Sequence, residues 1–375
     1  MHYYNFSLTA ELNKLDVDIT LVSTFETAIN LLRPEHITIL PGFKGIYGET
    51  PKYIRGLRYA YSLLKIKQLI LRSRPQITHF HFFQIPILDY LFLEVLEKIP
   101  TKRIITIHDV VPFAYGADVT VARHGFLHKI YQNASGLIVN SNHSMQKLAD
   151  LDANLLKKTI FIQPGAYTKY IPEQKFTTSE AKISLGLEPN TPIVLVFGTI
   201  KPNKRLDLVI EAISHLIATW PDIRLVIAGQ TQDRDVNSEI ALVKSLGISK
   251  NVIWKLERVS DEKMMLLFST ADVIVFPYQW IYQSAALLMA MSLRKAVIAT
   301  AVGSNQDIIE DGKSGLLVST TDARETAVAI QKLLADPQYA ARLAKAAKKD
   351  VTERFSWESI AQETKQFYTQ ILHQD

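Results

Sequence analysis

Cysteine is absent from all 375 residues of the chain. Its absence excludes disulfides, thiolate catalysis and cysteine metal sites, although it says little about the cellular compartment. No apolar run comes near the roughly 18 residues that a membrane span needs, and no secretory signal peptide opens the sequence. Internal repeats and low-complexity segments are absent as well. What remains is a globular chain, whose 47% hydrophobic content allows a large core and whose length suits two domains.

Acidic residues are slightly fewer than basic ones, which leaves a net charge of +5. This balance suits anionic partners such as nucleotides or a lipid surface, but many ordinary enzymes share it. The stretch 52–74 concentrates the charge, because it has a helical pattern with seven basic residues and no acid. Such a helix either contacts an anionic membrane or, more commonly, is the solvated flank of a sheet. We carry peripheral membrane contact forward as a hypothesis and expect no nucleic-acid partner.

Helical and strand patterns alternate along both halves of the chain, which predicts an α/β fold with doubly wound parallel sheets. In the first half, strands are predicted at 17–22, 36–40, 77–81, 103–107, 136–139 and 159–163. In the second half, strands are predicted at 193–197, 224–228, 252–254, 273–276, 296–300 and 315–318.

A break in this alternation indicates the domain boundary. Gln163-Pro164-Gly165 and the polar region to about Thr178 interrupt the pattern and predict a hinge. We therefore predict two Rossmann-like domains, at 1–170 and 178–355, whose sheets face a deep cleft between them. The closing helix, predicted at 357–373, is expected to pack back onto the first domain.

The stretch 278–318 together with the strand before it forms one βαβ unit of a parallel sheet. Its predicted parts are, in order, a strand at 273–276, a loop at 278–284, a helix at 285–292, a strand at 296–300 and a loop at 301–306. Ligands of such sheets lie at the carboxyl ends of the strands, against helix N-termini. Gln283 and Ser284 start the helix, and Ser284 is either a plain N-cap or a cap that leaves nearby N–H groups for a phosphate.

Two further sets of residues follow predicted strands. The loop from Gly198 to Arg205 brings a glycine and the lysines Lys201 and Lys204 to a helix N-terminus, which suits a phosphate, although a solvated basic loop would read the same way. His108 ends the strand 103–107 and either donates to a ligand oxygen or is a structural histidine. His79 and His81 share one face of their strand, and no acid at ligand spacing supports a metal site there.

Taken together, these motifs resemble the group 1 (family 4) retaining glycosyltransferases of the glycosyltransferase-B fold, in a subgroup with a Gln-Ser-Gly-like signature. The resemblance covers nearly the whole chain, and the set of motifs is specific although no single motif is. In the second domain it rests on residues 197–204, 258–262, 271–273, 277–278, 283–284, 302–303 and 310–316. In the first domain it rests on His79-Phe80-His81 and on Thr106-Ile107-His108-Asp109.

The resemblance implies that the second domain holds a nucleotide-sugar donor and that the first binds the acceptor. Lys201 and Lys204 match a basic pair that holds the diphosphate, and His108 matches a histidine that faces the transferred sugar, so these three are the implied catalytic residues. The implied donor-binding residues are Gly198, Lys201, Lys204, Arg258, Tyr278, Gln283 and Ser284. The family transfers its sugar with retention and without a metal, and no cofactor is implied. The cationic pair would stabilise the departing nucleoside diphosphate.

The sequence also departs from the family pattern. Many members carry two glutamates at the positions of Ile281 and Met289, so the contacts of those carboxylates to the sugar and ribose are lost. Ala285 replaces the glycine of the Gln-Ser-Gly signature, and Arg205 stands where glycine usually follows the lysine. The family's first strand, with its glycine-rich loop, is not found ahead of the first helix. A start site placed too far downstream would explain this, and a catalytically degraded protein is the second explanation.

We therefore predict a cytoplasmic glycosyltransferase, of the hexosyltransferase kind, acting on a lipid-linked or polysaccharide-type acceptor, in peripheral contact with the inner face of an anionic membrane. A rival hypothesis is a catalytically degraded glycosyltransferase-like subunit that binds a partner enzyme. The missing acids and the missing first strand favour this rival, whereas Lys201, Lys204 and His108 oppose it. A third hypothesis is an enzyme of the same fold with other chemistry, such as a sugar-nucleotide epimerase.

Overall fold

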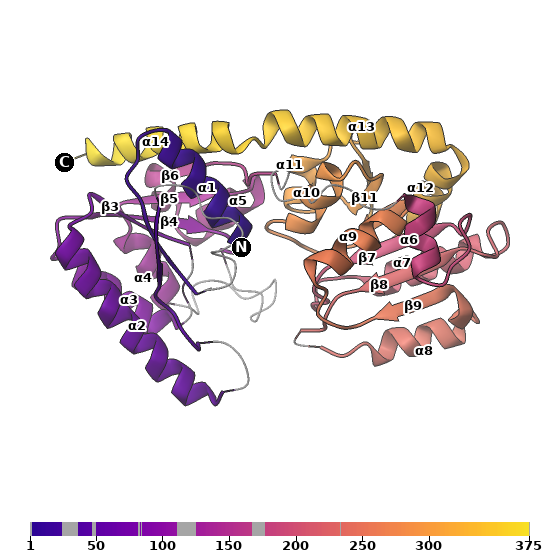
Figure 1. Ribbon diagram of the computed structural model, residues 1–375, viewed down its shortest axis with the longest axis horizontal. Coiled ribbons are helices and arrows are strands. Elements are labelled where there is room, and N and C mark those ends of the chain that lie inside the picture. Colours follow the sequence, from indigo (N-terminus) through magenta and orange to yellow (C-terminus); the bar gives the residue numbers. More distant parts are fainter. Residues whose placement is uncertain are drawn as a thin grey trace. The chain divides into compact units, whose positions relative to one another are not determined.

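The computed structural model describes residues 2–24, 37–46, 50–81, 83, 85–110, 125–166, 177–232 and 234–374. Two compact units make up the chain: unit 1 is Met1–Gly165 with Ser356–Asp375, and unit 2 is Ala166–Phe355 (Figure 1). The chain therefore passes from one unit to the other twice. The hinge predicted up to Thr178 lies largely outside the described residues.

Unit 1 contains two parallel sheets among its described residues. A two-stranded sheet pairs β1 (Thr20–Ser23) with β2 (Thr38–Pro41). A four-stranded sheet has the order β3-β4-β5-β6, with strands β3 (Ile77–Phe80), β4 (Lys102–Ile107), β5 (Gly136–Val139) and β6 (Thr159–Phe161). Each of these strands overlaps a predicted one, although β1 starts three residues later and β6 ends two residues earlier than predicted.

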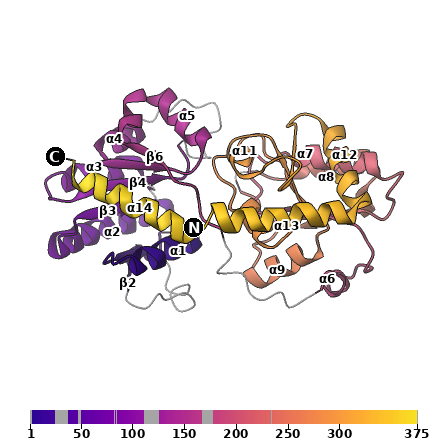
Figure 2. The ribbon, with the colours of Figure 1, turned by 90° about the horizontal axis from the view of Figure 1, so that it is seen from above.

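The helices of unit 1 are α1 (His2–Lys14), α2 (Lys52–Ser73), α3 (Pro86–Leu96), α4 (Gly125–Asn133), α5 (Asn142–Leu151) and α14 (Trp357–Leu372), with a 3-10 helix at Ala153–Lys158. Helices α1 and α14 lie side by side, as Figures 1 and 2 both show. They share one core with the four-stranded sheet, whose buried members include Tyr4, Leu8, Leu12, Ile104, Ile138, Trp357 and Phe367. Side chains of α1 at i, i+4 and i+8 therefore form the apolar stripe that their spacing predicts.

Unit 2 has one six-stranded parallel sheet in the order β12-β11-β10-β7-β8-β9. Its strands are β7 (Ile193–Phe197), β8 (Arg224–Ala228), β9 (Val252–Lys255), β10 (Val273–Phe276), β11 (Val297–Thr300) and β12 (Leu316–Val318). Its helices are α6 (Thr178–Ser184), α7 (Leu206–Leu216), α8 (Asn237–Ser245), α9 (Asp261–Thr270), α10 (Ala285–Ser292), α11 (Ser304–Ile308), α12 (Ala323–Ala335) and α13 (Pro337–Arg354), with a 3-10 helix at Ser249–Asn251.

Both faces of this sheet are buried, which explains why its strands read as continuous apolar runs. Alternate strand residues such as Val194, Leu225 and Val275 pack with α7 and α12 on one face. On the other face Phe197 contacts Phe268 of α9, with ring centroids 4.8 Å apart. The α/β class with a parallel sheet of several strands in each unit is thus confirmed for the described residues. Within those residues, no helix combines the length and the apolar character needed to cross a bilayer.

Strand order in unit 2 reverses between β7 and β10. From β7 the chain continues outward to β8 and β9, and from β10 it continues outward to β11 and β12 on the other side. In open α/β sheets this reversal point leaves the loops after the two central strands free to form a ligand site at their carboxyl ends. The loops after β7 and β10 are both among the candidates that the sequence indicates, together with the loop at 301–306 after β11.

Candidate functional site

Backbone hydrogen bonds join the loop after β7 to the loop after β10. Arg205 N–H donates to Pro277 O at 2.7 Å, and Gln279 N–H donates to Asn203 O at 2.8 Å. Lys204 and Tyr278 also form an isolated antiparallel bridge. The side-chain amide of Asn203 donates to the carbonyl of Trp280 at 2.8 Å. The two loops are therefore held as one structure, which fixes their side chains relative to each other.

The loop after β11 meets the same structure through Gly303. Its φ of +50° is a conformation that favours glycine. A Cβ at this position would lie 1.8 Å from the carbonyl oxygen of Ile281, so a side chain does not fit. Ser304 N–H donates to that same carbonyl at 3.3 Å. A glycine at this position thus lets the β11 loop close onto the β10 loop.

Lys204 is buried beneath these loops rather than extended into solvent. Only 1% of the residue is exposed, and its Nζ donates to the carbonyls of Phe197 at 2.8 Å and Gly198 at 3.1 Å. The same Nζ lies 5.5 Å from the ring centroid of Tyr278. Burial, and then the charge of Lys201, lowers the pKa of Lys204 to about 7. The structure therefore contradicts the alternative prediction of a solvated basic loop at Lys204, because this lysine is buried and its ammonium donates to two backbone carbonyls.

Tyr278 and Ser284 also lie in the loop and helix that follow β10, and Tyr278 is the residue whose ring lies near the Lys204 ammonium. Tyr278 is 8% exposed, and burial raises the pKa of its hydroxyl, against an opposing hydrogen bond with Ser284. Ser284 is the N-cap of α10, and its side chain accepts from Leu287 N–H at 3.3 Å. The capping alternative for Ser284 is therefore confirmed, while its part in binding a phosphate stays a prediction. Gln283 precedes it and is half-buried.

Gly198 has a φ of +104°, which a residue with a side chain rarely adopts. The loop after β8 approaches it closely, because a Cβ on Gly229 would lie 2.3 Å from Gly198 O. Lys201 is half-buried on the same loop as Gly198. Arg258 is exposed in the loop after β9, which β8 separates from β7. The structure thus brings together all the predicted donor-binding residues of the central loops and leaves Arg258 at a more distant strand.

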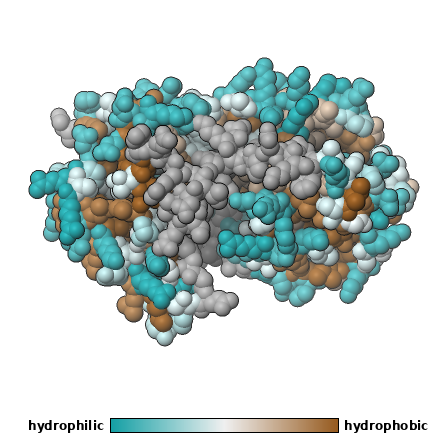
Figure 3. Space-filling view, in the orientation of Figure 1, coloured by the Kyte–Doolittle hydropathy of each residue, from teal (hydrophilic) through white to brown (hydrophobic). Residues whose placement is uncertain are grey.

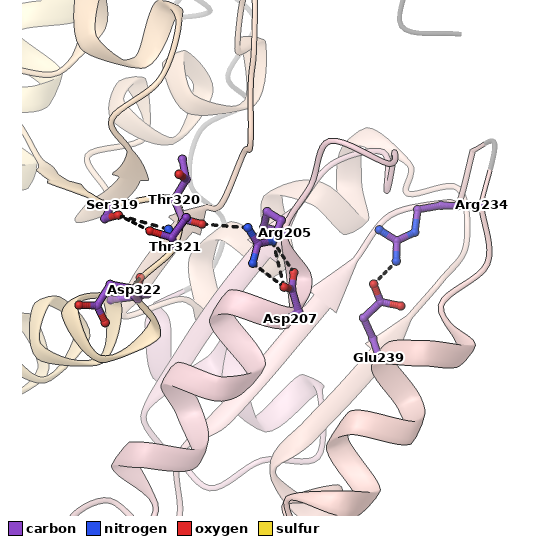
Figure 4. Close-up of polar contacts among 9 residues, drawn as sticks. Arg205, Asp207, Arg234, Glu239, Ser319, Thr320, Thr321 and Asp322 are labelled. Atoms are coloured by element: carbon purple, nitrogen blue, oxygen red, sulfur yellow. Dashed lines mark hydrogen bonds and ion pairs between the residues drawn. The ribbon is translucent and has the colours of Figure 1, made fainter. Parts of the chain in front are cut away.

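Arg205, which stands where the resemblance places a glycine, is held by partners of its own. Its guanidinium pairs with Asp207, with Nη2 2.7 Å from Oδ2, and Nη1 donates to the carbonyl of Thr320 at 3.0 Å (Figure 4). Figure 4 also shows a second pair on the β8 side of the sheet, between Arg234 and Glu239. The additional cation at position 205 is therefore already paired within the protein.

His108 lies at the carboxyl end of β4 in unit 1, as predicted, and it is buried. Its Nε2 is 3.4 Å from Nδ1 of His81. His79 has a partner at each ring nitrogen: Nδ1 meets the hydroxyl of Tyr368 at 2.6 Å, and Nε2 meets that of Thr106 at 2.7 Å. Burial, followed by the charge of His108, lowers the pKa of His79 to about 3. Burial and the two other histidines hold the pKa of His81 well below its usual range.

Sequence reasoning missed the residues that surround these histidines. The ring of Tyr4 lies edge-on to both His81 and His108, with centroids 5.5 and 5.1 Å away. Burial raises the pKa of Tyr4 to about 12. Tyr4 and Tyr368 lie on helices near opposite ends of the chain, and no local pattern connects them with β3 or β4. Across the described residues, no group of three or more His, Cys, Asp or Glu could hold a metal ion.

Comparison with known proteins shows what this arrangement is similar to. Residues 178–350 match the family described as glycosyl transferases group 1. The D-inositol 3-phosphate glycosyltransferase of Corynebacterium aurimucosum is 27% identical over 261 residues, which cover 68% of this chain and 61% of that protein. The alpha-maltose-1-phosphate synthase of Mycolicibacterium smegmatis is 30% identical over 217 residues, or 54% of each chain. The match thus spans roughly half to three fifths of these relatives.

Solved structures extend the likeness over nearly the whole fold. HepE of Anabaena, solved in complex with UDP-glucose, has a TM-score of 0.74 at 17% identity, covering 97% of this chain and 95% of that chain. Sucrose-phosphate synthase from Thermosynechococcus elongatus has a TM-score of 0.68 at 23% identity, covering 88% of this chain and 81% of that chain. At these identities the likeness establishes the fold, which is the predicted glycosyltransferase-B fold.

Proposed function

We propose that the chain is a group 1 glycosyl transferase, which transfers a sugar, with retention, from a nucleotide-sugar donor to a lipid-linked or polysaccharide-type acceptor. The single observation that carries the proposal is the joined pair of loops at the strand reversal of unit 2. They place Lys201, Lys204, Tyr278 and the start of α10 around one point at the carboxyl edge of the sheet. Cations and unpaired helix N–H groups at such an edge suit a diphosphate.

The donor's diphosphate is the part that these loops fit best. When the bond between the anomeric carbon and the phosphate oxygen breaks, negative charge grows on the departing diphosphate. Lys201 and Lys204 would stabilise that charge, and buried cations act strongly because little water screens them. The acceptor oxygen takes the place of the phosphate oxygen at the anomeric carbon, and its hydroxyl proton leaves with the nucleoside diphosphate. Because HepE of Anabaena was solved with UDP and with UDP-glucose, a uridine diphosphate hexose is the first donor to test.

His108 would act from unit 1 on the transferred sugar, which is the role that the resemblance implies. It lies at the carboxyl edge of its own sheet, where a ligand of unit 1 would approach. How the two units combine their residues stays a prediction, as do the separate acceptor and donor roles of the units.

A membrane-bound acceptor is supported by α2. The side of this helix that includes Tyr59, Leu63 and Ile70 is buried, as the spacing predicts. Its other side exposes large apolar side chains among the basic ones, including Tyr53, Leu57, Tyr61, Leu64 and Leu71. Figure 3 shows this mixture of hydrophobic and hydrophilic side chains over the region of α2. Peripheral binding to the inner face of an anionic membrane would use both, with about 1 kcal/mol for each basic residue near the lipid.

The test of the proposed function is a calorimetric screen of nucleoside diphosphates, followed by turnover of the matching nucleotide sugar. We expect UDP to bind and UDP-glucose to release UDP. His108→Ala should lower turnover at least tenfold and leave UDP affinity within about twofold, because its contact would be made to the sugar and not to the diphosphate. No affinity for any nucleoside diphosphate would refute the proposal. Binding without turnover, even with acceptor-containing membranes present, would instead favour the non-catalytic subunit.

A further inference from the structure

Three imidazoles form a continuous stack at the carboxyl edge of the unit 1 sheet. His79 and His81 lie on one face of the chain at β3, with ring centroids 4.3 Å apart and planes inclined by 31°. His81 and His108 follow, with centroids 5.6 Å apart and planes inclined by 28°. His81 is therefore the middle ring of the stack. Among the ring contacts of the described residues, it is the only one of the three histidines that touches both of the others.

The outer ring of the stack, His79 on β3, is anchored by hydrogen-bond partners on β4 and α14. His79 makes hydrogen bonds at both nitrogens, to Tyr368 and Thr106, so its ring has a fixed orientation. Because the two partners are hydroxyls, which both donate and accept, they can satisfy either neutral tautomer of His79. Its pKa of about 3 keeps that ring neutral at physiological pH. A neutral, doubly bonded His79 supports His81 without adding a like charge beside it.

Helix α1 contacts the edges of His81 and His108 through Tyr4. Tyr4 is 4% exposed, and its ring packs edge-on against His81 and His108 while also contacting Trp357, with a centroid distance of 5.1 Å. Aromatic contacts of this geometry restrict the orientation of the rings that they touch. His81 is therefore limited by His79 on one side and by Tyr4 at the edge, and its Nδ1 is directed at Nε2 of His108.

We propose that His81 is a positioning residue, which sets the ring orientation and the tautomer of His108 through the contact between His81 Nδ1 and His108 Nε2, with Tyr4 holding both rings. Two neutral imidazoles can bond only when one nitrogen carries a proton and the other does not. The contact therefore couples the tautomer of His108 to that of His81. This inference rests on the proposed function, because it assigns His108 a sugar contact that needs one orientation.

The test reads the tautomer of His108 directly, by long-range proton–nitrogen NMR of the histidine rings in the full chain. His108→Ala identifies the resonances by their loss. We expect one neutral tautomer for His108 in the wild-type protein and averaged nitrogen shifts of both tautomers in His81→Ala. His81→Asn should restore the wild-type shifts, since its amide lies near the place of the lost Nδ1. His215→Asn, on the exposed side of α7, is the matched control and should change nothing at His108.

Unchanged His108 shifts in His81→Ala would overturn the proposal. If that variant does not fold, His81→Gln takes its place, because its longer side chain carries the amide away from His108. His108 must then shift in His81→Gln and not in His81→Asn, and equal spectra of the two variants would refute the role of Nδ1.

Turnover of UDP-glucose, compared with the affinity for UDP, gives a second readout. In His81→Ala, turnover of UDP-glucose should fall roughly tenfold to a hundredfold, the effect of a displacement of about 1 Å, while UDP affinity stays within twofold. His81→Asn should recover most of the loss. A purely structural His81 would lower both quantities together through the folded fraction. If wild-type protein neither binds nor turns over the nucleotide sugar, the proposed function fails, whereas the NMR result still decides the inference about His81.

Discussion

Replacing Lys204 by methionine removes the buried ammonium and keeps a straight side chain of similar length. In the wild-type protein the ammonium donates to the carbonyls of Phe197 and Gly198, and burial holds its pKa at about 7. Near neutral pH the free protein is therefore a mixture of charged and neutral Lys204. A bound diphosphate favours the charged form. We predict that nucleoside diphosphate binding takes up a proton at Lys204.

The magnitude follows from the pKa. A drop from 10.5 to about 7 disfavours the protonated form by roughly 5 kcal/mol relative to water, since a tenfold change in an ionisation constant is worth about 1.4 kcal/mol. A charged hydrogen bond to a phosphate offsets about 1.5–3 kcal/mol of this, so the pKa of Lys204 rises in the complex. Lys204→Met should weaken diphosphate binding by that same roughly 1.5–3 kcal/mol at pH 7 and below.

Calorimetry in buffers of different ionisation enthalpy measures the protons taken up. Uptake by the wild-type protein should be largest between about pH 7 and 8.5, and affinity should fall as pH rises through that range. The phosphate of the ligand titrates too, near pH 6, so Lys204→Met at each pH supplies the baseline. Lys295→Met is the matched control, because Lys295 also donates to two backbone carbonyls, at 3.2 Å each, and burial lowers its pKa to about 8. Lys295 precedes β11, at the opposite edge of the sheet.

The pH dependence of the free energy of unfolding checks independently that folding lowers the pKa of Lys204. Because the pKa of Lys204 is lower in the folded protein than in the unfolded chain, the unfolded chain binds more protons between about pH 7 and 10. The free energy of unfolding of the wild-type protein should therefore rise with pH relative to that of Lys204→Met. Identical proton uptake in the wild-type protein and Lys204→Met would refute the coupling, and so would a stability difference that does not change with pH.

Two further predictions concern α2 and the β11 loop. The double change Leu57→Gln and Leu64→Gln should reduce sedimentation with anionic vesicles, most clearly at high salt. These side chains are 70% and 60% exposed, and they would supply the part of the binding that salt does not screen. The control Val328→Gln changes an exposed apolar residue of unit 2 and should have no effect, and equal sedimentation of the wild-type protein and both variants would leave α2 as an ordinary solvated helix. Gly303→Ala should destabilise the protein by roughly 2–4 kcal/mol in urea unfolding, since it adds a positive-φ side chain and a clash with Ile281 O. Gly247→Ala, which has a similar φ of +70° and no atom within 4 Å of its Cβ, should cost only about 1 kcal/mol; equal losses would contradict the clash.

Local patterns were sufficient for the architecture. The run 273–276 is apolar at every position because both faces of the sheet are covered, and its length distinguishes it from a helix. Alternation also placed His79 and His81 on one face of their strand, and their ring contact confirms it. The start of α10 at Ala285, with Ser284 as its cap, follows from the cap residue alone. Each of these predictions depends on residues within one or two elements.

The site required contacts that no local pattern encodes. The hydrogen bond between His79 and Tyr368 joins residues 289 positions apart, and Tyr4 reaches His108 from another helix. Burial of Lys204 was missed for a related reason. A basic residue in a glycine-containing loop reads as exposed, and only the bonds between the β7 and β10 loops fold that residue inward.

These backbone bonds have a consequence for the candidate site. They fix the β7, β10 and β11 loops before any ligand arrives, so binding would not have to order them. The electrostatic cost remains, because burial and the charge of Lys201 lower the pKa of Lys204 to about 7, so that its ammonium, which donates to two carbonyls, is only partly charged near pH 7. A neutral ligand would leave that cost in place, whereas a diphosphate offsets part of it through direct attraction. The geometry thus favours an anion over a neutral sugar at this point, and Lys204 would contribute its full charge only when the diphosphate is bound.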